Sequence, residues 1–400
     1  MRFRILDSWR GIAALCVVLF HFEAADHIHA LRFIRHSYLF VDFFFVLSGF
    51  VIAHAYGDKL KSPLEVWQFI VRRFGRVWPL HITVLAAFIA VAVFKYGLTA
   101  GLGMSATISA FDAAGSTPLA SLPVQVLLLQ AVDVTDRLTW NTPSWSISAE
   151  FWTYILFALI VLLLPRFRTI AFAVAAVLGV ATVVVFSHHG MDVTYDLGLP
   201  RSIFGFSVGY LVYWARPRIG PMPPALAYIA EVLTVLAIFA FVTMTNRSPL
   251  SYAAPFVFAI AVYVFSYELG PVSRLLRRPV FQNLGLWSYS IYMIHALIAF
   301  VIGLVVSELQ KRLGVDLWHV VVEDGISKRV IVSDHVLLLD AIHLAYAAAV
   351  VAISAFSYRL IEQPGRRYFQ SVADGMAKFR GKRMNPMAIN PSICQSQESR

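Results

Sequence analysis

Long apolar stretches separated by shorter polar or charged segments dominate the chain. Ten of these stretches approach the roughly 20 residues that an α-helix needs to cross a bilayer. Backbone polar groups inside lipid must be paired within the segment, so apolar spans of this length fold as helices. The pattern predicts an all-α integral membrane protein, a bundle of about ten transmembrane helices. The stretches are residues 10–28, 38–56, 78–96, 150–165, 169–187, 197–215, 225–245, 251–268, 284–305 and 335–357.

The composition agrees with this pattern, because 59% of the 400 residues are hydrophobic and only 14% are charged. A soluble domain carries roughly a quarter charged residues. The net charge of +10 would suit a nucleic-acid partner, but Lys and Arg gather in alternate connecting segments, as the positive-inside rule requires. We therefore expect both termini in the cytoplasm, membrane lipids around the chain and no nucleic-acid partner.

The segments outside the apolar stretches divide the chain further. Residues 97–144 and 307–334 form two long connections. The first includes an apolar piece, residues 122–131, that is too short to span and suits the membrane interface. After residue 369 the sequence becomes basic and then polar, a composition typical of disorder. We expect one membrane domain over residues 1–369 and a disordered cytoplasmic tail over residues 370–400.

The N-terminal sequence resembles a signal peptide, because Arg2 and Arg4 precede an apolar run. Arg10 interrupts the inner end of this run and no small-x-small cleavage site follows, so we expect the segment to remain as the first span. The two cysteines, Cys16 and Cys394, provide neither a disulfide framework nor metal-ligand spacing. We expect no metal site.

Ionisable residues inside spans are costly, and each one is a hypothesis of function. Arg10 and His21 are eleven positions apart, which on a helix brings them to nearly the same face, about 16 Å apart along the axis. A cation at the cytoplasmic boundary then shares a stripe with an imidazole near the membrane midplane, where the imidazole can act as a general base on a hydroxyl. The alternative is that Arg10 anchors the helix end and His21 only bonds a neighbouring span.

Three arginines form a second group before the third apolar stretch. Arg73 and Arg76 are three residues apart and share one helical face, and Arg72 lies beside them. Guanidinium groups bind phosphate through paired hydrogen bonds. The functional reading is a phosphorylated cytoplasmic cofactor, and the alternative is a positive-inside anchor that touches lipid headgroups.

Other polar residues also fall in or beside spans. Asp42 and Glu150 lie near the expected outer ends of the second and fourth spans, where an unpaired carboxylate is costly. Ser288, Tyr292 and His295 share one face of the ninth span. This polar stripe predicts either a cavity or a hydrogen-bonded seam between helices.

These residues belong to short motifs that follow one another along the chain. The motifs are LDSWRGIAAL at residues 6–15 closing on His21-Phe22, VDFFFVLSGF at residues 41–50, Arg73-x-x-Arg76 followed by Trp78-Pro79, SWSISAE at residues 144–150, SYSIYMIH at residues 288–295, and Glu362-x-Pro364. The ordered set resembles the acyltransferase 3 family of multi-pass membrane O-acyltransferases. The resemblance covers residues 6 to 364, and Trp9 is a small departure from the family pattern.

The resemblance implies transfer of an acyl group, usually acetyl, from cytoplasmic acyl-CoA to a hydroxyl of a cell-surface glycan or lipid-linked sugar. It also implies a bacterial inner (plasma) membrane protein. Because a thioester is already activated, such a site needs a base and stabilisation of an oxyanion rather than a metal.

The candidate roles follow from the position of each residue. We expect His21 to be the general base, with His295 as the other candidate at similar depth. Arg10 would position the donor or stabilise the transition state. Asp42 and Glu150 would orient a histidine or bind acceptor hydroxyls.

The cofactor-binding candidates are Arg73 and Arg76, with Arg72 beside them, as ligands of the CoA phosphates. Two other classes of protein remain open. A transporter or flippase for a lipid-linked sugar or small solute would use intramembrane histidines and acids as proton-relay or substrate groups, although paired broken helices in two matching halves are not evident. A membrane scaffold would use the same charges only as packing contacts.

Overall fold

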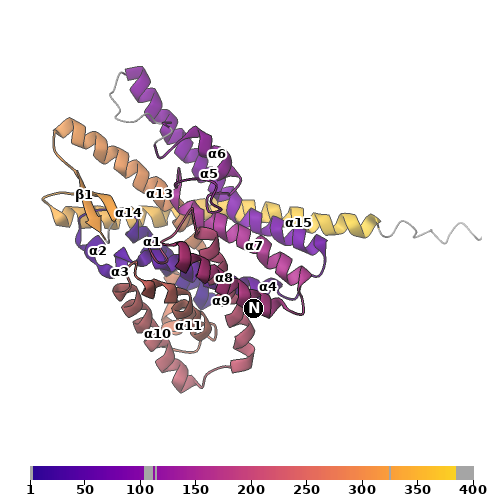
Figure 1. Cartoon of the computed structure of the whole chain (residues 1–400). Helices are drawn as coiled ribbons and strands as arrows, with labels where there is room; N and C mark the ends of the chain where they lie inside the picture. Colours follow the sequence, from indigo (N-terminus) through magenta and orange to yellow (C-terminus); the bar gives the residue numbers. More distant parts are fainter. Residues whose placement is uncertain (1–2, 103–110, 113–114, 324–325, 384–400) are drawn as a thin grey trace, which may run out of the picture.

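Helices make up most of the chain in the computed structural model, which describes residues 3–102, 111–112, 115–323 and 326–383 (Figure 1). The α-helices are α1 (Arg4–Phe20), α2 (His27–Ala30), α3 (Arg32–Arg35), α4 (Phe40–Tyr56), α5 (Pro63–Leu102), α6 (Leu122–Val126), α7 (Trp145–Leu163), α8 (Arg168–Phe186), α9 (Gly198–Ile219), α10 (Pro224–Met244), α11 (Ala254–Phe265), α12 (Pro271–Leu276), α13 (Pro279–Leu313), α14 (Val336–Ser357) and α15 (Gln363–Arg383). Short 3-10 segments are η1 (Ser37–Leu39), η2 (Leu119–Ser121), η3 (Thr142–Ser144) and η4 (Pro249–Ala253), and η5 (Tyr358–Glu362) is a π-helix.

Each of the ten predicted spans overlaps a helix: α1, α4, α5, α7, α8, α9, α10, α11, α13 and α14. Within the described residues, seven helical segments are long and apolar enough to cross a membrane, and they contain α4, α5, α7, α8, α10, α13 and α14. The other three fall short because α1 has 17 residues, α11 has 12, and α9 is less apolar, with arginines in its first and last turns and glycine and serine residues between them. The protein is therefore a helical membrane protein with seven candidate spans, and the expected number of ten stays a prediction.

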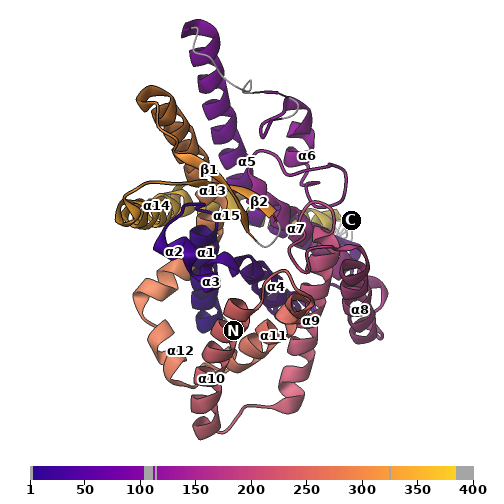
Figure 2. The same cartoon turned by 60° about the vertical axis from the view of Figure 1, so that its left-hand side comes forward.

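The first helix lies at the centre of the bundle and crosses α13 closely (Figure 2). Gly11 and Gly285 meet at this crossing, where a Cβ on Gly11 would lie 2.5 Å from the backbone nitrogen of Gly285. Only glycine allows two backbones to approach this closely. The crossing brings the polar faces of α1 and α13 together along their length.

The end of α1 differs from its predicted position. The apolar stretch 10–28 predicted a span with His21 inside it, whereas the helix ends at Phe20 and His21 is its C-cap. The chain then turns, and the Asp26 side chain caps α2 by accepting a hydrogen bond from the backbone of His29 at 2.6 Å. Hydropathy alone extends the span through this turn because apolar residues, among them Phe22, Ala24 and Ile28, continue past the end of the helix.

The all-α prediction needs one correction, a two-stranded antiparallel hairpin of β1 (Trp318–Glu323) and β2 (Ile326–Ile331). Valine and isoleucine dominate these residues and favour a strand. The end of β2 joins the segment after α1, since Ile331 donates to the Glu23 carbonyl at 2.9 Å and Ala25 donates to the Ile331 carbonyl at 2.8 Å. The hairpin thus covers the end of α1 that carries His21.

The connection between α5 and α7 packs into the protein. Leu128 and Ala131, in the piece expected at the interface, are fully buried. Polar side chains satisfy the backbone of this segment: His81 of α5 bonds the Gln125 carbonyl at 2.9 Å, and Trp152 of α7 donates to the Leu128 carbonyl at 2.8 Å. This segment therefore holds the start of α7 inside the bundle.

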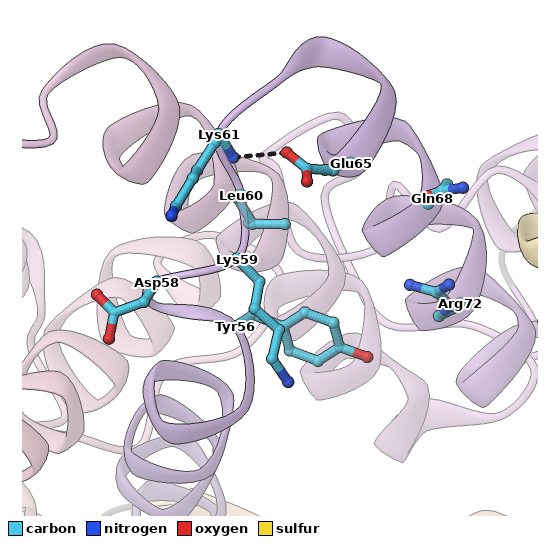
Figure 3. A pocket seen from close by; sticks show the side chains of 8 residues that line it. All are labelled: Tyr56, Asp58, Lys59, Leu60, Lys61, Glu65, Gln68 and Arg72. Atoms are coloured by element: carbon cyan, nitrogen blue, oxygen red, sulfur yellow. Dashed lines mark hydrogen bonds between the residues drawn. The ribbon is translucent and has the colours of Figure 1, made fainter. Parts of the chain in front are cut away.

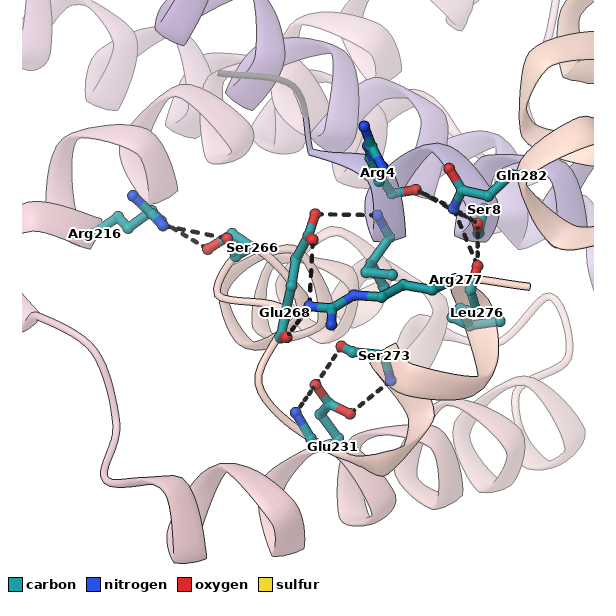
Figure 4. Close-up of polar contacts among 12 residues, drawn as sticks. Arg4, Ser8, Arg216, Glu231, Ser266, Glu268, Ser273, Leu276, Arg277 and Gln282 are labelled. Atoms are coloured by element: carbon teal, nitrogen blue, oxygen red, sulfur yellow. Dashed lines mark hydrogen bonds and ion pairs between the residues drawn. The ribbon is translucent and has the colours of Figure 1, made fainter. Parts of the chain in front are cut away.

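At the opposite end, polar contacts close the bundle around the start of α1 (Figure 4). The buried carboxylate of Glu231 in α10 accepts hydrogen bonds from the backbone and side chain of Ser273 in α12. Glu268 accepts a hydrogen bond from the backbone of Ile5 at 3.2 Å and lies 3.8 Å from Arg277. These contacts fix α1 relative to the connection between α11 and α12.

The last helix, α15, packs along the first half of α5. Phe369 covers Gly75, and Gly365 faces Pro79. The domain boundary expected at residue 369 falls inside this helix, and residues 384–400 of the expected tail lie outside the described residues.

Candidate active site

Arg10 points from α1 onto the polar face of α13. Its Nε donates to the Ser288 hydroxyl at 2.8 Å and an Nη donates to the Gly285 carbonyl at 3.1 Å. Asp7, one turn earlier on α1, lies 3.3 Å from the same guanidinium. Arg10 is thus held against α13 rather than turned outward as a helix-end anchor.

His21 lies at the other end of the same stripe and meets His295. The two rings are 4.7 Å apart between centroids, at an interplanar angle of 52°. His21 and His295 therefore meet across α1 and α13. Arg10 and Ser288 form a second contact between the same two helices, nearer the start of each. The two pairs are separated by eleven residues on α1 and by seven on α13, which rise about 16 Å and about 10 Å along the respective helices.

The hydrogen bonds of His21 fix which nitrogen is basic. Its Nδ1 lies 2.8 Å from the Val17 carbonyl, and a carbonyl oxygen only accepts, so Nδ1 carries the hydrogen. In the neutral ring the free lone pair is then on Nε2. His295 is fully buried, and neither of its ring nitrogens has a hydrogen-bond partner of acceptable geometry among the described residues. Buried polar groups in this state are uncommon and mark sites that a ligand or water completes.

Helix α14 contacts the backbone beside both histidines. Tyr346 donates to the His295 carbonyl at 3.2 Å. His343 bonds the Leu19 carbonyl through Nε2 at 3.1 Å and the Asp26 carboxylate through Nδ1 at 2.7 Å. Both His343 and Asp26 have no exposed side-chain surface. Their position suits them to hold the two catalytic candidates in register.

The arginine motif lies near the level of Arg10. Arg76 pairs with Glu362 at 3.1 Å, and the other oxygen of that buried carboxylate accepts from Ser290 of α13 at 2.8 Å. Arg10 interacts electrostatically with both Arg76 and Glu362. Arg366 of α15 adds a further cation beside Arg76. The sequence motifs named Glu362 but gave it no role, and its partner could only be found from the fold.

Arg73 faces aromatic rings and keeps an unused donor. Its guanidinium lies over the rings of Tyr56, Phe69 and Tyr154 at 5.3 to 5.9 Å. It donates to the Tyr56 hydroxyl at 3.4 Å, while its buried Nε has no partner in the described part of the chain. Arg73 is therefore a half-buried cation that can accept an anionic ligand without breaking an ion pair.

Arg72 is separated from Arg73 and Arg76 and binds the exposed Asp374 of α15 at 2.6 Å. It lines a cleft beside the start of α5 (Figure 3). The sequence grouped the three arginines, and Arg72 and Arg76 are four residues apart on one helical face. The structure divides them by their partners, because Arg72 binds Asp374 whereas Arg76 binds the buried Glu362.

Glu150 belongs with the arginines rather than with an outer surface. Its carboxylate accepts from Tyr154 at 2.5 Å, and the Tyr154 hydroxyl also bonds Ser48 of α4 at 3.0 Å. Glu150 acts electrostatically on both Arg10 and Arg76. Its contacts thus join Glu150 to the arginine motif, and the depth expected for it in the membrane stays a prediction.

Asp42 makes a different kind of contact. It forms a doubly bonded ion pair with Arg201 of α9, at 3.0 and 2.8 Å, and neither side chain is exposed. Arg201 also donates to the Val193 and Tyr38 carbonyls. With all of these bonds satisfied, the contacts of Asp42 are those of a structural pair, and its catalytic role stays a prediction.

Within the described residues no group of three or more His, Cys, Asp or Glu side chains is arranged to hold a metal ion. The four cationic residues Arg10, Arg73, Arg76 and Arg366 outnumber the three carboxylates Asp7, Glu150 and Glu362 among them. The site can therefore bind an anion at these arginines and present the imidazole pair of His21 and His295 further along the α1–α13 stripe.

The chain was compared with known proteins. The model of the family described as "Acyltransferase domain" (acyltransferase 3) matches residues 3–332. Over 391 residues the chain is 25% identical to BcsY of Komagataeibacter xylinus, named as a membrane-bound transacylase, covering 95% of this chain and 87% of that protein. No solved structure matches.

Two relatives match shorter regions. Protein 2 in the picA locus of Rhizobium radiobacter is 43% identical over 102 residues, which span 24% of this chain and about half (49%) of that protein. The acyltransferase MdmB of Streptomyces mycarofaciens is 35% identical over 121 residues, 30% of this chain and 27% of that protein. Because the family model matches most of the chain, with the Arg10–His21 stripe, the arginine motif and the polar face of α13 all inside the matched region, this membrane protein belongs to the acyltransferase 3 family.

Proposed function

We propose that this protein transfers an acyl group, in the first instance acetyl, from cytoplasmic acyl-CoA to a hydroxyl of a cell-surface glycan or lipid-linked sugar. The proposal includes a location in a bacterial inner membrane. The observation that supports this proposal most directly is the polar stripe between α1 and α13. The stripe has a cationic group at one end, with Arg10, Arg73 and Arg76, and an imidazole pair at the other, with His21 and His295. Anion binding and base catalysis are the two needs of acyl transfer from a thioester.

The reaction can be written with these residues. An acceptor hydroxyl attacks the thioester carbonyl carbon, forming a C–O bond while His21 Nε2 takes the hydroxyl proton. The resulting oxyanion collapses, the C–S bond breaks, and the imidazolium returns its proton to the leaving thiolate. The products are an ester and free CoA thiol, and no oxidant, reductant or metal is needed.

An acyl-transfer assay with purified protein in lipid nanodiscs tests this proposal. Acetyl-CoA should yield free CoA thiol, and an added glycan or lipid-linked sugar should gain the mass of one acetyl group. Omission of either substrate serves as the control. Solute counterflow in proteoliposomes without acyl-CoA, together with no thiol release, would instead identify a transporter.

A further inference from the structure

A cleft of about 400 Å³ opens beside the connection between α4 and α5 (Figure 3). Figure 3 shows side chains from the end of α4, from this connection and from the first turns of α5 arranged around it. Among the lining residues Tyr56 also contacts the candidate active site, through Arg73. The lining residues are Tyr56, Asp58, Lys59, Leu60, Lys61, Glu65, Gln68 and Arg72.

The two acids at the cleft already have partners. Asp58 pairs with Arg168 of α8 at 2.8 Å. Glu65 accepts hydrogen bonds from the Lys61 backbone and from the Ser62 hydroxyl, both at 2.9 Å, while Ser62 accepts from the Glu65 backbone. This reciprocal arrangement is a capping box that begins α5. Both carboxylates are therefore held mainly by other groups of the protein, and the charge of Lys61 acts on Glu65 less than these hydrogen bonds do.

The cationic side chains at the cleft, in contrast to its acids, are exposed or held only by an exposed partner. Lys59 and Lys61 are exposed, and neither ammonium has a carboxylate partner among the residues that the structure describes. Arg72 bonds Asp374, whose side chain is 63% exposed, so an incoming anion can replace that carboxylate at small cost. Three cations thus face a cleft whose own acids are engaged elsewhere.

Tyr56 connects this cleft to the candidate active site. Its ring contacts Lys59 on the cleft side, at 5.9 Å, and its hydroxyl accepts from Arg73, whose Nε has no partner. A ligand in the cleft can therefore extend past Tyr56 to Arg73, and from there toward Arg76 and Arg10.

We propose that the cleft binds the 3′-phosphorylated nucleotide end of the acyl-CoA donor, an inference that rests on the function proposed above. The ribose 3′-phosphate would lie against Lys59, Lys61 and Arg72, and the diphosphate would reach Arg73. A volume of about 400 Å³ lies at the lower end of the usual 300–1,000 Å³ for cofactor sites, which suits one end of a long cofactor. The flexible arm then follows the α1–α13 stripe with the thioester toward His21.

Binding of CoA and of 3′-dephospho-CoA to the full-length protein in neutral phosphatidylcholine nanodiscs tests this assignment. The unmodified protein should bind CoA several-fold more tightly. The double variant Lys59→Ala/Lys61→Ala should lose roughly fivefold in CoA affinity at low salt, because exposed charge contacts are weak and screened, while its affinity for 3′-dephospho-CoA stays unchanged. The matched control Arg218→Ala/Arg274→Ala removes two exposed cations elsewhere and should keep the preference.

Each other outcome overturns the proposal in a distinguishable way. Equal binding of both compounds by the unmodified protein, or a preference that survives in the double lysine variant, refutes the cleft but leaves acyl-CoA as donor. Failure to bind either compound refutes both proposals. If the lysine variant changes behaviour only in nanodiscs that contain an anionic lipid, and shows no effect on 3′-phosphate preference, the lysines bind lipid headgroups instead.

Discussion

The two histidines of the candidate site differ in what their ring nitrogens already bond. His21 uses Nδ1 on the Val17 carbonyl, which leaves Nε2 with a lone pair and a fixed direction. His295 has both nitrogens unengaged within the described residues, and only its backbone is held, by Tyr346. A base needs a defined lone pair at the reacting hydroxyl. His21 meets this requirement, and His295 is better suited to bond a substrate group.

We expect His21→Gln to abolish acyl transfer as completely as His21→Ala. Glutamine can replace a structural hydrogen bond but cannot accept the proton productively, and base catalysis is typically worth about 10²–10⁴ in rate. Thiol release from acetyl-CoA in the presence of acceptor is the measurement. His188→Gln, at an exposed loop residue, is the matched control. Near-native transfer by His21→Gln would move the role of base to His295.

Arg73 is the sharper test of donor binding, because Arg76 also neutralises the buried Glu362 and its loss would strain the fold. Arg73→Ala should weaken acyl-CoA binding about ten- to a hundredfold, since one charge-assisted contact contributes roughly 1.5–3 kcal/mol. Arg73→Lys should restore only part of the affinity, because an ammonium lacks the guanidinium fork. Titration of purified protein with acetyl-CoA gives both values. Normal affinity in a folded Arg73→Ala variant would make this arginine an anchor only.

Asp42→Asn should destabilise the protein. It leaves the buried Arg201 guanidinium without its counter-charge, and removal of one partner from a buried pair costs about 3–5 kcal/mol. The readout is the thermal unfolding midpoint and the monodisperse yield in detergent. A variant with native stability but lost turnover would instead place Asp42 in the mechanism, as the sequence allowed.

At the scale of elements, α14 connects to both halves of the histidine pair. The Leu19 carbonyl only accepts, so His343 Nε2 must carry a hydrogen, and one further proton lies between His343 Nδ1 and Asp26. Both ring nitrogens of His343 are thus bonded to groups of α1 and of the turn after it. Phe22 packs between His343 and Tyr346, with ring centroids 4.7 and 4.9 Å away. Through these contacts α14 fixes where α1 ends and where His21 points.

His343→Gln should lower kcat about ten- to a hundredfold, because a shift of about 1 Å at the end of α1 misplaces the base. Acyl-CoA affinity should change little, since the arginine level lies at the other end of the stripe. Tyr346→Phe removes a single hydrogen bond of about 0.5–1.5 kcal/mol and should give a smaller effect in the same direction. Equal losses in binding and turnover would show general unfolding rather than a positioning role.

The sequence predicted those elements that local hydropathy defines. The bounds of α4, α8, α10 and α14 lie within a few residues of the predicted spans, because each is a continuous apolar helix. The end of α1 was missed because apolar residues such as Phe22 and Ile28 continue past it. The strands β1 and β2 were missed because they are short and lie in a charged connection. The partners of Asp42 and Glu362 were missed for a different reason: Arg201 and Arg76 are 159 and 286 residues away in the chain.

At the scale of the whole molecule, the segments that the charge pattern assigns to the cytoplasm contact one another at one end of the bundle. The connection after α4 meets the start of α8 through Asp58 and Arg168, 2.8 Å apart. The end of α9 meets the end of α11 through Arg216 and Ser266, also at 2.8 Å. The start of α1 joins the connection between α11 and α12 (Figure 4). These basic segments therefore share one end of the bundle, which two-sided charge sorting requires.

His54 links these groups, because its ring lies 5.0 Å from that of Phe3 and 6.1 Å from that of Tyr213, near the ends of α1 and α9. We expect reporter fusions after Arg168, Arg218 and Arg278 all to report cytoplasm, as positive-inside orientation predicts for the end that holds these arginines. A paired reporter for cytoplasmic and external location, read in intact bacterial cells, gives the measurement. One fusion reporting outside would break the proposed orientation, and it would also separate the cleft at Lys59 and Lys61 from the compartment that supplies acyl-CoA.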